Sequence, residues 1–119
     1  MQNLGEAKEI VATYDDLKEL TGNFTCNKKI FERMLPFDPE SLYFFSLDAD
    51  ALEASIMEGV SAVNHRGLPY HFVAELLDYS LQTLKVKHFG FYEYNPVYDN
   101  LSQKGARVLA SLIYRIMDY

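Results

Sequence analysis

The sequence predicts an α/β fold in which two parallel strands are joined by a crossover helix. Residues 42–47 form a short, continuous apolar run, which is typical of a strand that is covered on both faces of a parallel sheet. Residues 70–84 place apolar side chains at helical spacing, and residues 86–94 form a second strand. A strand, a crossover helix and a second strand make a right-handed unit with parallel strands.

Two helices are predicted ahead of the first strand, so residues 1–41 form a helical lead-in. The first covers residues 6–20, and Gly22 suits the left-handed turn that ends a helix. The second covers residues 28–35, begins after Asn27 as its cap and stops before a proline. The apolar face of the first helix consists of Ala7, Ile10, Val11, Tyr14 and Leu17.

The remaining segments are a long loop and a closing helix. Residues 53–69 show poor periodicity and contain two glycines, and loops of that length inside compact domains are often functional. The last helix is predicted over residues 101–117, with Asp99 or Asn100 as its cap. The whole chain of residues 1–119 is therefore expected to be one domain, of which residues 42–119 carry the strand–helix–strand unit.

Composition excludes several classes of protein. The chain has 119 residues and a net charge of −6, which argues against nucleic acid or an anionic membrane as a partner. Its 49% hydrophobic content is too high for a disordered chain. The sequence shows neither a secretory leader nor an apolar run of about 18 residues. The single cysteine, Cys26, fits a reducing compartment, so we predict a cytoplasmic location.

Two strands make a poor sheet on their own. Both strands are apolar, and each would present an unpaired edge. The chain is therefore expected to be a piece of a larger α/β domain or to associate with a second copy of itself.

The first candidate site lies where the first strand ends, at Asp48 and Asp50. Ligands of open parallel sheets bind outside the carboxyl ends of the strands. Residues two apart on a strand point the same way, so both carboxylates could reach one hard cation such as magnesium or manganese. Equally, one aspartate could cap the next turn while the other is solvated.

The second candidate is Glu93, at the end of the second strand. It stands among aromatic residues in the stretch Phe91-Tyr92-Glu93-Tyr94-Asn95-Pro96. A carboxylate there could bind a cationic group or adjust a metal site, since its desolvation requires a partner. The alternative is an edge glutamate that reaches solvent past its neighbours.

Together these motifs resemble the ureohydrolase family, which includes arginase, agmatinase and formimidoylglutamase. The segment SLDADALEASIMEGVSAVNHRG follows a family signature without a gap. It departs from that signature at Ala49, where a larger apolar residue is usual, and at Glu58, which replaces a proline. The E-x-N-P motif that begins at Glu93 follows at the family's distance. The GVSA run points to the formimidoylglutamase branch. The signature positions that match are Ser46, Asp48, Asp50, Ala54, Gly59 and Gly67.

The resemblance implies a three-layer αβα fold with a parallel sheet, and it implies roles for three residues. Asp48 would bridge two manganese ions and Asp50 would bind one of them. Glu93 would hold the guanidino or formimino group of a small-molecule substrate. The family hydrolyses linear amidines, giving urea and an amine or formamide and glutamate.

The resemblance also implies ligands that the sequence lacks. The family's other metal ligands lie upstream, in a D-x-H-x-D motif and a separate histidine, but no such motif occurs here and the 41 residues before Leu42 contain no histidine. We therefore expect a partial C-terminal portion of the fold that is inactive as an isolated chain. A missing N-terminal portion or another copy would be its partner.

Two other interpretations stay open at this stage. A degenerate relative could survive as a non-catalytic oligomerisation or interaction module. An apolar strand ending in D-x-D also occurs in aspartyl phosphatases and in some glycosyltransferases, but Leu52 stands where those phosphatases place Thr or Val. His65, His71 and His88 match no family ligand; His88 is expected to be a packed or edge residue, while His65 and Arg66 border the site in the family.

Overall fold

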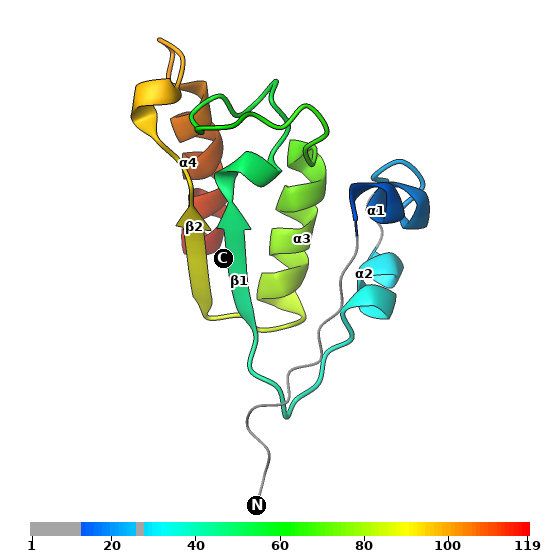
Figure 1. The fold of residues 1–119 in the computed structure, drawn as a ribbon. Helices are drawn as coiled ribbons and strands as arrows, with labels where there is room; N and C mark the ends of the chain where they lie inside the picture. Colours follow the sequence, from blue (N-terminus) through cyan, green and yellow to red (C-terminus); the bar gives the residue numbers. More distant parts are fainter. Residues whose placement is uncertain (1–12, 26–27) are drawn as a thin grey trace, which may run out of the picture.

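The computed structural model describes residues 13–25 and 28–119. It contains four helices and two strands in the described residues (Figure 1). Two short 3-10 turns, η1 and η2, follow the strands. In chain order the elements are α1 (Tyr14–Leu20), α2 (Lys28–Met34), β1 (Phe44–Asp48), η1 (Ala49–Ala51), α3 (Tyr70–Gln82), β2 (His88–Tyr92), η2 (Pro96–Tyr98) and α4 (Lys104–Met117).

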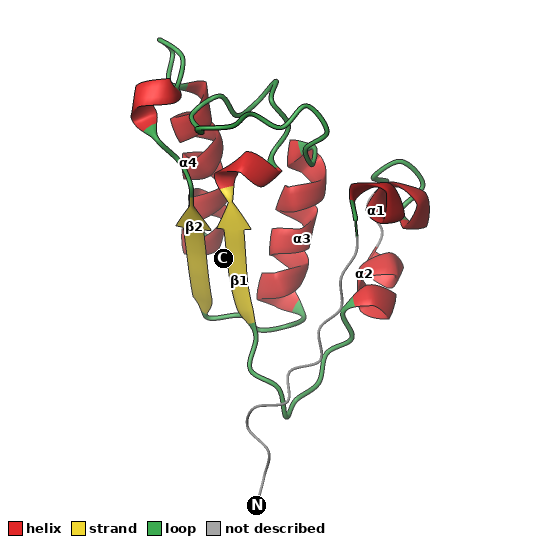
Figure 2. Cartoon of the chain, viewed as in Figure 1, coloured by secondary structure: helices red, strands yellow, loops and turns green. Residues whose placement is uncertain are grey.

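The sheet consists of β1 and β2, which run parallel as predicted (Figure 2). The register pairs Phe44 with His88 at one end and Asp48 with Tyr92 at the other. Helix α3 forms the crossover between the strands. The strand–helix–strand unit predicted from the sequence is therefore confirmed, and the carboxyl ends of both strands meet at one edge.

One face of the sheet carries the main core. Leu47 on β1 is buried together with residues of α3 and α4, and both helices run alongside the strands (Figure 1). Leu77 of α3 and Leu112 of α4 are completely buried. The partly buried rings that pack against this cluster from the strands are Phe45, Phe89 and Phe91.

The prediction that the first strand is covered on both faces is wrong for the described residues. Phe44, Ser46 and Asp48 are exposed, whereas the side chains between them face the core. Both covering helices lie on the same face, so the alternation of the strand leaves the other side chains in solvent. Phe44 is 66% exposed and Tyr92 of β2 is 55% exposed. Among the described residues, Phe44 and Tyr92 are therefore large side chains left more than half exposed on this open face.

Helix α1 starts later than predicted. Thr13 has extended backbone and forms a capping box with Asp16, in which each side chain accepts the other's backbone N–H at 3.1 Å. The helix consequently begins at Tyr14, and residues 6–12 of the predicted helix lie outside the described residues, as do Cys26 and the predicted cap Asn27. The left-handed turn at Gly22 is confirmed, with φ at +57°.

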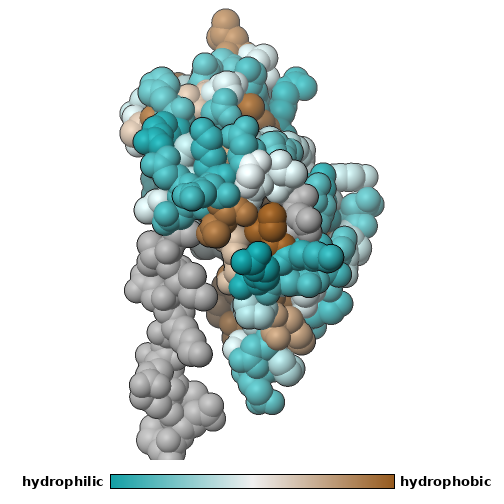
Figure 3. All heavy atoms as spheres, turned by 90° about the vertical axis from the view of Figure 1, so that its right-hand side faces the viewer, coloured by the Kyte–Doolittle hydropathy of each residue, from teal (hydrophilic) through white to brown (hydrophobic). Residues whose placement is uncertain are grey.

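The lead-in helices contribute a second, aromatic core. Phe24 and Phe31 are buried against Phe72 and Tyr79 of α3, and neighbouring rings lie 5.3 to 5.8 Å apart. Packing of this kind attaches α1 and α2 to the strand–helix–strand unit. On the face that α1 and α2 present, hydrophobic residues are visible between hydrophilic ones (Figure 3). A hollow of about 190 Å³ on these helices is lined by Leu20, Ile30, Arg33 and Met34.

The long loop after β1 is more ordered than its composition suggests. Isolated parallel bridges pair Leu52 with Leu68 and Glu53 with Asn64. Leu52 and Met57 are completely buried, so the loop supplies part of the main core. The loop therefore forms a packed layer over the carboxyl end of the sheet.

Helix α4 begins at Lys104, three residues later than predicted. The predicted caps still satisfy its first turn. The Asp99 carboxylate accepts the N–H groups of Gly105 and Ala106, each at 3.1 Å, and the Asn100 side-chain oxygen accepts the N–H of Lys104 at 3.0 Å. No helix in the described residues is both long and apolar enough to cross a membrane.

Candidate functional site

The candidate site is built on the edge where β1 and β2 end. Asp48 is the last residue of β1, and its register partner Tyr92 is the last residue of β2. Glu93 follows directly. The parallel register therefore brings Asp48 and the backbone of Glu93 to the same edge of the sheet, as the sequence predicted. Both side chains are exposed.

Asp50 does not lie on the strand, as the sequence argument assumed. The strand ends at Asp48, and Asp50 lies half-buried in η1. The argument that residues two apart on a strand share a face therefore does not apply to this pair. Ala49 between them is 1% exposed in the main core. The 3-10 turn η1, in which Ala49 is buried, connects the two aspartates.

Glu93 has an uncommon backbone conformation. Its φ is +67°, in the left-handed region that residues other than glycine seldom adopt. Its neighbours separate in consequence: Tyr92 is exposed, whereas Tyr94 is half-buried and packs on the main core. The expectation of an aromatic setting is met only on one side. The open side fits the alternative of an edge glutamate that reaches solvent.

A hydrogen-bonded network next to Glu93 was missed by the sequence reasoning. The Tyr94 hydroxyl donates to Asp99 at 2.7 Å, and the Asn95 N–H donates to the Gly59 carbonyl at 2.6 Å. The ring of Tyr94 lies against Gly59, where a Cβ would overlap it. The sequence predicted that Asp99 caps α4, which pointed to part of this network. No signal in the sequence indicated the hydrogen bond between Tyr94 and Asp99.

Hydrogen bonds stabilise the negative charge of Asp99 in this network. Burial alone would raise the pKa of Asp99, but hydrogen bonds from the Tyr94 hydroxyl and from the N–H groups of Gly105, Ala106 and Asn100 lower it below its ordinary value. The hydrogen bond to Asp99, helped by burial, in turn raises the pKa of Tyr94. Asp99 is therefore an ionised acceptor around neutral pH.

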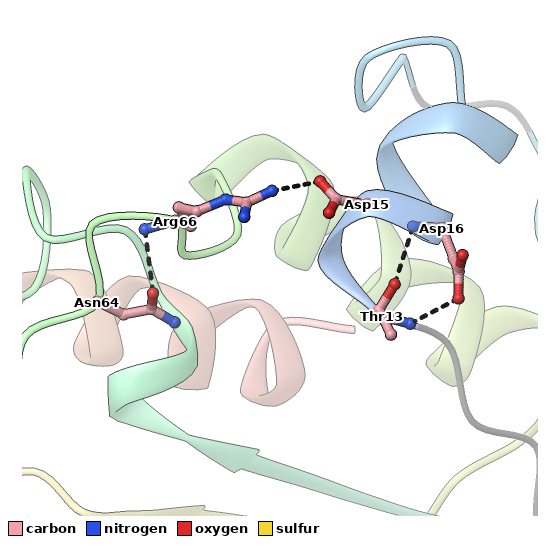
Figure 4. Close-up of polar contacts among 5 residues, drawn as sticks. All are labelled: Thr13, Asp15, Asp16, Asn64 and Arg66. Atoms are coloured by element: carbon pink, nitrogen blue, oxygen red, sulfur yellow. Dashed lines mark hydrogen bonds and ion pairs between the residues drawn. The ribbon is translucent and has the colours of Figure 1, made fainter.

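Arg66, one of the two loop residues that border the site in the family, contacts the first helix of the lead-in. Arg66 forms an ion pair with Asp15 of α1 (Figure 4). Its guanidinium lies 5.0 Å from the ring centroid of Tyr14. Its backbone N–H donates to the Asn64 side chain at 3.0 Å. Both partners of the ion pair are largely exposed, so the pair adds little stability. Arg66 is thus engaged with the lead-in helix.

The histidines do not complete a metal site. His88 starts β2, at the opposite end of the strand from Tyr92, and its ring lies 5.4 Å from that of Phe44; the expectation of a packed or edge residue is confirmed. A ring nitrogen of His71 lies 2.7 Å from the Phe24 carbonyl oxygen. His65 is exposed in the long loop.

The donor set falls short of a manganese centre. Among the residues that the structure describes, no group of three or more His, Cys, Asp or Glu side chains could hold a metal ion. Asp48 and Asp50 are carboxylates of the type that manganese accepts, but two side chains leave most coordination positions to water. These residues therefore do not by themselves fit the two-metal group that the family implies.

Comparison with known proteins decides the family. The sequence profile of the Arginase family matches residues 9–118. The chain belongs to the arginase family. It is 34% identical over 89 residues to the formimidoylglutamase of Cupriavidus pinatubonensis, an alignment that covers 75% of this chain and 28% of the relative. Membership in the arginase family argues against the phosphatase alternative.

The fold is likewise that of arginases. The arginase of Bacillus caldovelox superposes with a TM-score of 0.63 at 19% identity, covering 86% of this chain and 33% of that protein. The arginase of Medicago truncatula gives a TM-score of 0.51 at 24% identity, covering 87% of this chain and 35% of that one. The chain thus spans about a third of the length of the arginase-family proteins that it matches. It is a partial arginase fold, as the sequence predicted.

Proposed function

We propose that this chain is the C-terminal portion of a manganese-dependent hydrolase of linear amidines, of the formimidoylglutamase type. The observation that carries the proposal is that Asp48 and the backbone of Glu93 lie at one edge of the sheet, since the register pairs Asp48 with Tyr92 and Glu93 follows. Family membership and the 34% identity to a formimidoylglutamase support the reaction class. Arginase or agmatinase activity is the next candidate.

In this proposal the three carboxylates have separate tasks. Asp48 and Asp50 contribute oxygen ligands to manganese, and polypeptide outside these 119 residues supplies the others. Glu93 pairs with the planar, positively charged formimino or guanidino group, for which a carboxylate offers a two-point hydrogen-bonding match. When bound, manganese would activate water for attack on the amidine carbon.

The isolated chain is expected to be inactive for the same reason. Two carboxylates bind a divalent ion weakly, so calorimetric titration with manganese should give no more heat than the Asp48→Ala/Asp50→Ala double variant. The chain should not hydrolyse formiminoglutamate, arginine or agmatine. Turnover that needs manganese and is lost on Asp48→Ala would contradict the expected inactivity.

A chimera tests the reaction class directly. The matching 89-residue segment of the Cupriavidus pinatubonensis formimidoylglutamase would be replaced by the corresponding segment of this chain. We expect manganese-dependent hydrolysis of formiminoglutamate, lost on Asp48→Asn and retained in the matched control Glu75→Gln on the exposed face of α3. A folded chimera that binds no manganese would count against the proposed function.

A second candidate function is a non-catalytic oligomerisation module. The open sheet face favours it, because Phe44 and Tyr92 are more than half exposed there. The free edge of β1 also borders a groove of about 480 Å³, lined mostly by apolar side chains of β1, α3 and the segment before β2. In that case the aspartates would be inherited without serving chemistry.

A further inference from the structure

The feature that points beyond the proposed function is the left-handed backbone conformation at Glu93. In an extended strand Tyr92 and Tyr94 would lie on the same face. Instead Tyr92 is exposed, with its ring over Gly90, whereas Tyr94 packs on the main core. The left-handed backbone of Glu93 separates these two rings. Because that conformation is uncommon outside glycine, neighbouring contacts must hold it.

Tyr94 is held at both its ring and its hydroxyl. Gly59 and Gly105 leave the space that the ring occupies: a Cβ on Gly59 would overlap it, and one on Gly105 would lie 3.1 Å from it. The hydroxyl donates to Asp99 at 2.7 Å. The next residue is also fixed, because the Asn95 N–H donates to the Gly59 carbonyl.

Asp99 is itself anchored to α4 and cannot easily move away. Its Oδ1 accepts the N–H groups of Asn100 at 2.9 Å and Gly105 at 3.1 Å. Its Oδ2 accepts the N–H of Ala106 at 3.1 Å as well as the Tyr94 hydroxyl. The first turn of α4 thus fixes the carboxylate, and the carboxylate fixes the tyrosine that follows Glu93.

We propose that Asp99 is a positioning residue, which acts through Tyr94 to hold Glu93 in its left-handed conformation at the edge shared with Asp48. The substrate role of Glu93 rests on the proposed function, but the mechanical link does not. The strained backbone of Glu93 is held by contacts of the residues that follow it: the ring and hydroxyl of Tyr94 and the N–H of Asn95. The link therefore joins the helix α4 to the position of the candidate substrate-binding carboxylate.

Nuclear magnetic resonance on the isotope-labelled chain tests this link without metal or substrate. The coupling between the amide and α protons of Glu93, with its ¹³Cα shift, reports φ at that residue. We expect both to move toward extended values in Tyr94→Phe and further in Asp99→Ala. Hydrogen exchange at the Asn95 amide should become roughly tenfold faster, the effect of losing about one hydrogen bond. Exchange at the Leu112 amide in the core reports global unfolding, so it should rise only as far as the free energy of unfolding of each variant falls.

The matched control is Tyr98→Phe, which removes a hydroxyl from an exposed tyrosine in η2. It should leave the Glu93 coupling and the Asn95 exchange rate unchanged. Unchanged Glu93 signals in a folded Asp99→Ala variant would overturn the proposal. If that variant does not fold, unchanged Glu93 signals in Tyr94→Phe would overturn it equally. A folded chimera that binds no manganese or is inactive would contradict the proposed function and leave this result standing.

Discussion

At the scale of single residues, Asp99 illustrates how one carboxylate serves two elements. It caps the first turn of α4 and also receives the hydroxyl of Tyr94. Hydrogen bonds to an ionised acceptor are stronger than neutral ones, at about 1.5–3 kcal/mol each in stability. Removing the hydroxyl alone should therefore have a measurable effect on folding while leaving the backbone caps in place.

The Tyr94–Asp99 bond predicts a defined pH dependence. The pKa of Asp99 is lowered from 3.8, so its contribution is present above about pH 4 and is lost as the pH falls through the folded value. The pKa of Tyr94 is raised from 10.0, so its contribution is lost as the pH rises through the folded value. Tyr94→Phe should therefore lower the free energy of unfolding by about 1.5–3 kcal/mol between these limits and by less outside them.

Urea denaturation of the wild type and Tyr94→Phe across the pH range measures this difference. Tyr98→Phe is the control, because its ring is 55% exposed, and it should change stability by less than about 0.5 kcal/mol throughout. A difference between wild type and Tyr94→Phe that stays constant down to about pH 2 would show that the hydroxyl does not pair with an ionised carboxylate.

At the scale of elements, the loop after β1 depends on Gly67. A Cβ at this position would lie 2.5 Å from the backbone of Leu52 and Glu53. Backbone atoms cannot rotate away as a side chain can, and the parallel bridge from Leu52 to Leu68 lies at the same place. Gly67→Ala should therefore destabilise the chain by about 3 kcal/mol, the upper end for overpacking.

Thermal or urea unfolding checks the effect, with Gly22→Ala as the comparison. Gly22 has φ at +57° and open space around its Cα, so the alanine variant there meets only backbone strain. Its expected cost is about 1–2 kcal/mol. If Gly67→Ala proved no more destabilising than Gly22→Ala, the close packing of Gly67 against the backbone of Leu52 and Glu53 would not limit stability, and the prediction would be wrong.

Local sequence signals predicted the elements whose causes are local. The bounds of α2 and α3 agree with their periodicity within about two residues. The start of α4 was wrong, because Asp99 and Asn100 bond to its first turn across an intervening bend rather than from the adjacent position. The left-handed turn at Glu93 had no local signal, since it depends on Tyr94 being held by Gly59 and Asp99.

The candidate site was predictable for a different reason. Strand order and parallel direction follow from the strand–helix–strand pattern, so the sequence could bring Asp48 and Glu93 to one edge. The placement of Asp50 relied on strand alternation and failed, because the strand ends at Asp48, two residues before Asp50. The sequence of a strand does not show which of its faces other elements cover. Here α3 and α4 pack on one face of the sheet, which the strand sequences could not predict.

At the scale of the whole molecule, the open sheet face is the feature from which we predict self-association. Phe44 is 66% exposed on that face, and the free edge of β1 borders the apolar groove of about 480 Å³. Unpaired strand edges beside exposed apolar surface are sites at which chains associate. We therefore predict that the isolated chain self-associates, against a repulsion from its net charge of −6 that salt would screen.

Sedimentation velocity at micromolar concentrations, with and without added salt, measures this association. The sedimentation coefficient of the wild type should rise with concentration and with salt, whereas Phe44→Lys should sediment closer to a monomer. Leu101→Lys is the matched control: it adds the same charge at a fully exposed residue in the turn before α4, away from the sheet, and should behave as the wild type does. A monomer that persists over the whole concentration range would mean that the uncovered face does not drive association, and the oligomerisation module would lose its support.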